Sequence, residues 1–166
     1  MIHDITRLLA TLALAGAMLV GPTGCKDSSS SNLTDLGHSH LKYKPGQAWR
    51  YRARPGEEQS KLTVLRVEVH PTLGTIVHVR LDGLRIRNPK APGGYTDTAT
   101  HLPFSEKALD DSVLAVSALA GPVPEYQEGY NLWRKSFDAG KGGVFTISVS
   151  EAVDGMEKGL ATGTAG

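Results

Sequence analysis

The sequence predicts an α+β domain in which a small antiparallel sheet of about four strands is covered on one face by helices. Two patterns in the 166-residue chain support this class. Apolar and polar residues alternate through much of 46–87, which is typical of half-buried strands, and apolar residues recur with helical spacing between 105 and 137. The predicted order is three strands, two helices, a strand and a helix, and strands followed by helices are typical of α+β domains.

The first three predicted strands lie within 46–54, 61–70 and 75–87. The first of them, GQAWRYRAR, alternates apolar residues with arginines. A turn at 71–74 joins the second and third strands into an antiparallel hairpin. The side chains predicted to face the core are Trp49, Tyr51, Ala53, Leu65, Val67, Val69, Val77, Val79 and Leu81.

The alternation in the third strand shifts by one residue at a glycine. Before Gly83 the inward residues include Leu81, and after it they are Leu84 and Ile86. A β-bulge at Asp82–Gly83 keeps all of these side chains on the core face. The sequence therefore predicts a bulge at this point.

A loop is predicted at 88–96. After it, the spacing of the apolar residues changes to that of a helix. Ser105 is a predicted N-cap, and Gly121-Pro122 ends the helix. The buried stripe of this helix is Leu109, Val113, Val116 and Ala120.

A second helix is predicted within 125–143, followed by a strand at 144–150 and a last helix capped by Ser150. The second helix carries an aromatic stripe that we assign to the core, and the AGKGG segment at 139–143 is its stop rather than a phosphate loop. The aromatic stripe is Tyr126, Tyr130, Trp133 and Phe137, and the inner side of the last helix is Val153, Met156 and Leu160.

The start of the chain has the pattern of an export signal. An apolar run at 8–20 is too short to span a membrane but has the length of a signal-peptide core. With Gly24-Cys25 behind it, the segment resembles a bacterial lipoprotein signal, although Pro22 replaces the usual Leu, Val or Ile. The resemblance implies cleavage before Cys25 and a lipid on its sulfur. Lys26, in place of an aspartate, favours sorting to the outer membrane.

These features predict four segments: a signal peptide at 1–24, the lipidated Cys25 with a flexible serine-rich tether at 25–41, a single domain at 42–161 and a disordered tail at 162–166. Cys25 is the only cysteine, so the chain forms no internal disulfide. The formal charge is +1. Because the domain follows an export signal, no nucleic-acid partner is expected.

Several short elements in the domain are similar to those of a family of small bacterial proteins of unknown function. The elements are HLPFS at 101–105, a Gly-Tyr-x-x-Trp helix at 129–133 and a Gly-x-Phe-Thr-Ile strand at 143–147. The resemblance spans most of 45–160. It implies a single intact domain and brings no activity, ligand or catalytic residue.

Two arrangements of histidines are candidates for a functional site, the first catalytic and the second metal-binding. His101 with Ser105, or with Asp110 or Asp111, suggests a hydrolase, but Ser105 is needed as a helix cap and no G-x-S-x-G turn is present.

The second arrangement is a weak metal site. His70 and His78 lie on the outward face of the hairpin and could meet across it, with Glu68 or Asp82 nearby. Solvated surface histidines are the alternative interpretation. No catalytic residue, metal ligand or cofactor is assigned.

Arginines supply the candidate partner-binding residues. In a cell envelope they would contact anionic lipid headgroups, cell-wall polymers or an acidic protein; a solvated face with internal ion pairs is the alternative. The set is Arg50, Arg52, Arg54, Arg66, Arg80, Arg85 and Arg87.

The sequence favours a lipid-anchored, non-enzymatic binding module at the outer membrane, facing the periplasm. A hydrolase using His101 and a weak metal-handling lipoprotein are the alternatives.

Overall fold

The computed structural model describes residues 33–35 and 41–162, all within one unit that spans Ser31–Gly166. The predicted signal peptide, Cys25 and residues 163–166 lie outside the described residues. The elements, in chain order, are β1 (Thr34–Asp35), β2 (Ala48–Tyr51), β3 (Lys61–His70), β4 (Gly74–Arg87), a 3₁₀ turn (Pro92–Gly94), β5 (Tyr95–Ser105), α1 (Glu106–Asp110), β6 (Val113–Ala118), α2 (Gln127–Asp138) and α3 (Val149–Thr162).

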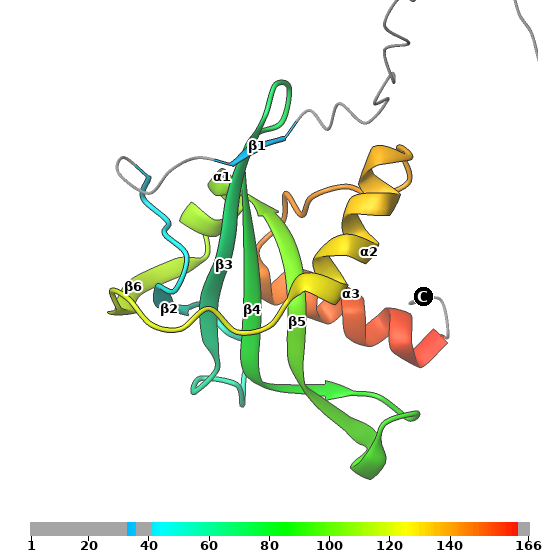
Figure 1. Ribbon diagram of the computed structural model, residues 1–166. Helices are drawn as coiled ribbons and strands as arrows, with labels where there is room; N and C mark the ends of the chain where they lie inside the picture. The colour runs from blue at the N-terminus through cyan, green and yellow to red at the C-terminus, as the bar shows by residue number, and fades with distance from the viewer. Residues whose placement is uncertain (1–32, 36–40, 163–166) are drawn as a thin grey trace, which may run out of the picture. The chain divides into compact units, whose positions relative to one another are not determined.

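The strands form one sheet in which all pairings are antiparallel, in the order β5-β4-β3-β2-β6, with β1 attached to β3 (Figure 1). The predicted α+β class is confirmed, with six strands in place of about four. Thr34 and Asp35, inside the predicted tether, form the short strand β1 because they pair with Val69 and Glu68.

The predicted hairpin and its bulge are both present. β3 pairs with β4 through the turn at 71–74. Gly83 has φ +78°, a backbone conformation that favours glycine. Leu81, Leu84 and Ile86 all join the same buried core cluster, so the bulge keeps the apolar side chains on one face.

A second bulge, in β3, was not predicted. Val64 pairs with Val79 and Arg66 pairs with His78, which leaves Leu65 as an extra residue. Leu62, Val64 and Val67 therefore face the core, while Arg66 and Glu68 face the opposite side of the sheet. Leu65 is buried but lies outside the core cluster.

Helices cover both faces of the sheet rather than one. Ala108 and Leu109 of α1 and Val149, Ala152 and Val153 of α3 belong to the core cluster. Tyr130 and Trp133 of α2 pack on His78 and His101 on the other face. In Figure 1, α3 passes behind β4 and β5, and α2 stands beside β5.

The predicted helix from Ser105 to Ala120 is wrong in its second half. Ser105 is the N-cap, accepting a hydrogen bond from the Ala108 N–H, but α1 ends at Asp110. Ser112 turns its hydroxyl back to the Ala108 carbonyl, and its own carbonyl accepts from the Arg52 N–H. Residues 113–118 then pair with β2 as β6.

The predicted strand at 144–150 is also absent. Phe145 makes a single bridge to Phe104, and α3 already begins at Val149. Ser148 caps this helix in place of Ser150: its hydroxyl accepts from the Glu151 N–H, and the Glu151 carboxylate accepts from the Ser148 N–H. This reciprocal arrangement is a capping box.

Candidate functional site

A buried chain of polar side chains links three neighbouring strands beneath α2. Glu68 comes from β3, His78 from β4 and His101 from β5. The Glu68 Oε2 atom lies 3.0 Å from His78 Nε2, and His78 Nδ1 lies 2.9 Å from His101 Nε2. Glu68 is 1% exposed and His78 is fully buried. We call Glu68, His78 and His101 the histidine relay.

A bulge in β5 brings His101 into the relay. Val79 pairs with Leu102 and Leu81 with Ala99, so Thr100 and His101 both stand opposite the single residue Arg80. The bulge places Ala99 and Leu102 on the core face while His101 points to the α2 face. Bulges next to functional sites commonly redirect a side chain in this way.

The hydrogen bonds define the direction of the relay. An ionised Glu68 only accepts, so His78 must donate from Nε2. Neutral His78 then accepts at Nδ1, and His101 donates to it from Nε2. Within the described residues, His101 makes its side-chain hydrogen bond through Nε2 alone, and no buried side-chain nitrogen or oxygen lacks a partner. Its Nδ1 is therefore a solvent-reached acceptor.

Burial and hydrogen bonding set the charge states. Burial raises the pKa of Glu68, but hydrogen bonds from His78 and Tyr130 outweigh this and bring the pKa to about 2. Burial lowers the pKa of His78 against the opposing effect of Glu68. Burial, with His78 beside it, lowers the pKa of His101 to about 4. At neutral pH the relay is a carboxylate followed by two neutral imidazoles.

Charged and hydroxyl groups complete the contacts of Glu68. Its Oε1 atom accepts from the Tyr130 hydroxyl and from Arg66 Nε, both at 2.9 Å. Arg134 of α2 lies 3.9 Å from the same oxygen and donates to the Tyr130 hydroxyl. Glu68 is thus the acceptor at which β3, β4 and α2 meet.

The aromatic stripe of α2 packs on this polar cluster rather than on the apolar core. The Trp133 ring lies 4.8 Å from His78 and the Phe137 ring 5.4 Å from His70, both edge to face. Tyr130 lies 5.3 Å from His78. The predicted place of the stripe in the core is wrong, because its members lie outside the core cluster.

The three sequence elements of the resemblance contact one another. Trp133 Nε1 donates to the Gly143 carbonyl at 2.8 Å, which joins the Gly-Tyr-x-x-Trp and Gly-x-Phe-Thr-Ile elements. Phe104 of HLPFS packs on Phe145 with ring centroids 5.1 Å apart, and His101 packs on α2. The three elements form one packing unit that holds α2 against β5.

Gly129 lets α2 approach β5. A Cβ atom there would lie 2.8 Å from the His101 Cβ. We expect Gly129→Ala to lower the free energy of unfolding by about 1–3 kcal/mol, because α2 must move away from the relay. Urea unfolding measures this.

The matched control is Gly155 in α3, where a Cβ would meet nothing within 4 Å. Gly155→Ala should stabilise the protein by up to about 1 kcal/mol through helix propensity. Equal effects of the two substitutions would contradict the close-packing explanation.

The residues suggested for a hydrolase are not assembled. Ser105 caps α1, and Asp110 accepts from the Tyr43 hydroxyl and from Lys42. Asp111 pairs with Lys107. His101 instead bonds to His78. What the relay offers chemically is one proton acceptor, the Nδ1 atom of His101.

The predicted meeting of His70 and His78 does not occur. His70 pairs with Gly74 at the hairpin end, and His78 pairs with Arg66, four residues further along β3. At about 3.3 Å per residue, four residues separate their backbone positions by about 13 Å along the hairpin, which is too far for a shared metal ion. His70 Nδ1 accepts from the Thr72 and Leu73 N–H groups. The described residues contain no group of three potential metal ligands.

The predicted arginine set divides into two groups. Arg54, Arg66 and Arg80 are held in ion pairs, with Glu57, Glu68 and Asp82 respectively. Arg54 also pairs with Asp154 and Glu157 of α3, which ties that helix to the loop after β2. The exposed members are Arg50, Arg52, Arg85 and Arg87.

Sequence reasoning placed Glu68 near His78 as part of a weak metal site, but it did not connect either residue with His101. It also missed Tyr130 and Arg134 as polar partners. One available signal was Gly129: a glycine inside a helix beside an aromatic stripe indicates a close approach to another element.

No protein-family model, curated protein or solved structure matches this chain. Among the described residues, no helix is both long and apolar enough to cross a membrane.

Proposed function

We propose that this chain is a lipid-anchored protein of the bacterial cell envelope, sorted to the outer membrane and facing the periplasm. We further propose that its domain is a non-enzymatic module that binds an anionic envelope component. The observation that carries the binding proposal is the exposure of four arginines: Arg50, Arg52, Arg85 and Arg87. Guanidinium groups grip phosphate and carboxylate through paired hydrogen bonds. The anchor rests on the apolar run at 8–20 followed by Gly24-Cys25.

The contacts of the candidate catalytic residues support a binding role over hydrolysis. Ser105 and Asp110 serve in a helix cap and an ion pair. The histidine relay is hydrogen-bonded from Glu68 through His78 to His101 Nε2. The bond from Tyr130 to Glu68 and the ring contacts of the two histidines fix α2 to the sheet. Membership of the family with HLPFS, Gly-Tyr-x-x-Trp and Gly-x-Phe-Thr-Ile elements is part of this proposal, and it adds no activity.

Cys25→Ser should release the protein from the membrane. Two or three acyl chains bind a bilayer far more firmly than one, at about 0.8 kcal/mol per buried CH₂, so removing their attachment site abolishes anchoring. Fractionation of cells that express the full chain measures this, and mass spectrometry of the mature N-terminus identifies the lipid. Wild-type chain in the soluble fraction, with its leader intact, would contradict the anchor.

Replacing Arg50, Arg52, Arg85 and Arg87 by glutamine should weaken binding to an anionic probe at least about tenfold, because each basic side chain near such a surface contributes about 1 kcal/mol. The probes are phosphatidylglycerol vesicles and soluble polyglutamate, which separate a lipid headgroup from a carboxylate polymer. Binding should also fall as salt rises.

The matched control replaces four exposed lysines by glutamine and so changes the net charge equally: Lys61, Lys90, Lys141 and Lys158. This control should retain most of the binding. If both sets of substitutions weaken binding equally, general charge rather than the arginines accounts for it.

A further inference from the structure

The outer ends of β4 and β5 form an arm that projects beyond the rest of the sheet, at the foot of Figure 1. The arm comprises residues 83–97. Its tip is closed by a hydrogen bond of 2.8 Å from the Asn88 N–H to the Gly94 carbonyl. Residues 83–96 include three basic side chains and no acidic one. The arm therefore carries a local excess of positive charge.

Two arginines and a tyrosine share one face of this arm. Tyr95 stands directly opposite Arg87 in the β4–β5 register, and directly opposed side chains lie on the same face of a sheet. Arg85 precedes Arg87 by two residues, and its guanidinium carbon lies 5.1 Å from the centre of the Tyr95 ring. Ile86, between the two arginines, is fully buried and faces the other way. We define Arg85, Arg87 and Tyr95 as the arm face.

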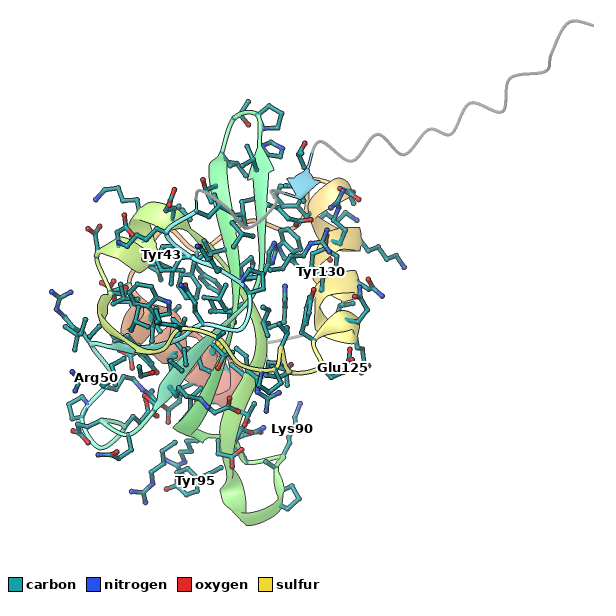
Figure 2. All side chains as sticks on the ribbon, turned by 60° about the vertical axis from the view of Figure 1, so that its left-hand side comes forward. Tyr43, Arg50, Lys90, Tyr95, Glu125 and Tyr130 are labelled. Atoms are coloured by element: carbon teal, nitrogen blue, oxygen red, sulfur yellow. The ribbon has the colours of Figure 1, made fainter. Side chains whose placement is uncertain are left out.

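The arm face is open to solvent. Tyr95 is 50% exposed, and both arginines are exposed. Within the described part of the chain, neither guanidinium group forms an ion pair with a carboxylate. Figure 2 shows Lys90 on the opposite side of the arm from Tyr95, so this lysine does not belong to the face. Two guanidinium groups and one aromatic ring are thus available to a ligand together.

The backbone beneath this face is held by two carboxylates. The Arg85 N–H donates to Glu57 at 2.5 Å, and the Arg87 N–H donates to Glu157 at 2.9 Å. Both carboxylates are in turn ion-paired with Arg54. The two arginines therefore project from a fixed backbone, which lowers the entropy cost of ordering them around a ligand.

The chemistry of the arm face fits a polysaccharide that carries carboxylates. Guanidinium groups bind carboxylates through paired hydrogen bonds, and an exposed tyrosine ring packs against the apolar C–H face of a sugar ring. Asp97, the next residue but one after Tyr95, adds an acceptor for sugar hydroxyl groups. Residues 87–97 contain no large aliphatic side chain that could enter a bilayer, which disfavours a lipid surface.

We propose that the arm face binds an acidic polysaccharide of the cell envelope. A sugar ring packs on Tyr95, and the carboxylate of that sugar or of its neighbour is bound by Arg85 and Arg87. This inference rests on the proposed function, because it names the class of anionic component that the domain binds. It assigns recognition to the arm rather than to Arg50 and Arg52, which β3 separates from β4 in the sheet.

The test uses the chain from residue 25 with Cys25→Ser, so that no lipid contributes. Calorimetric titration should show that polygalacturonate binds more tightly than polyglutamate at equal carboxylate concentration, and that neutral dextran does not bind. Arg85→Gln with Arg87→Gln should weaken polygalacturonate binding at least about tenfold, because two charge-assisted contacts are lost. The matched control is Arg50→Gln with Arg52→Gln, which removes the same charge elsewhere and should retain most of the binding.

Tyr95→Leu separates sugar recognition from charge. It should weaken polygalacturonate binding about tenfold and leave polyglutamate binding unchanged, whereas Tyr95→Phe, which keeps the ring, should bind like the parent chain. Equal losses for the two arginine pairs, or full binding by Tyr95→Leu, would overturn the assignment to the arm face. A chain that binds polyglutamate but not polygalacturonate would overturn this inference alone, and one that binds no anionic probe would overturn the proposed binding function as well.

Discussion

Replacing Glu68 by alanine is expected to lower the free energy of unfolding by about 3–5 kcal/mol, the range measured when one partner of a buried charged pair is removed. His78, Tyr130 and Arg66 all donate to this one carboxylate. Without it, the donors from three elements lose the one acceptor that they share. Urea unfolding followed by circular dichroism measures the change.

Glu68→Gln separates the charge from the hydrogen bonds. Its amide oxygen can still accept from Tyr130, and its NH₂ group then faces His78 Nε2. His78 and His101 can both switch tautomer, which reverses the relay and makes His101 Nδ1 a donor. We therefore expect a smaller loss, about 1–3 kcal/mol. Imidazole ¹⁵N shifts would report the switched tautomers.

The matched control for both variants is Glu128→Ala, an exposed carboxylate in the first turn of α2. It should change stability by no more than about 0.5 kcal/mol. A loss below about 1 kcal/mol for Glu68→Ala would show that the relay does not hold α2 to the sheet.

Local patterns in the sequence predict the hairpin and its bulge because the information is contained in one segment. The parity of apolar residues changes at Gly83, and only a bulge there keeps Leu84 and Ile86 with Leu81 in the core. Ser105 was predictable for the same reason, since a cap acts on the next three residues.

β6 could not be predicted in this way. Leu109, Val113 and Val116 fit a helical spacing, but the fold of 113–118 is decided by pairing with β2, more than sixty residues earlier in the chain. The two bulges of β6 also hide the period of two that identifies a regular strand. A non-local contact thus overrides the local pattern.

The histidine relay was hidden because its residues occupy outward positions on three strands. Such positions normally predict solvent-exposed side chains. The relay forms because α2 covers this face, and Gly129 allows the close contact with His101. Neither the strand order nor the position of α2 follows from the spacing of the histidines.

Acid should destabilise the folded domain in two successive steps. The pKa of His101 is about 4 in the folded protein against 6.5 ordinarily, so the unfolded chain binds more protons between these values. The resulting stability is fully present above pH 6.5 and is lost as the pH falls through 4. The pKa of Glu68, about 2 against 4.5, adds a second loss below pH 4.5. The lowered pKa of His78 acts in the same direction as that of His101.

Urea unfolding at intervals from pH 7.5 to 3 measures this. We expect His101 to account for a loss of about 2–3 kcal/mol between pH 7 and 4, since one pKa unit corresponds to about 1.4 kcal/mol. His101→Gln should flatten the curve in that window. Constant stability of the wild-type domain from pH 7 to 4.5 would contradict a neutral, buried relay. If the stability of His101→Gln falls with pH as steeply as that of the wild type, groups other than His101 take up the protons.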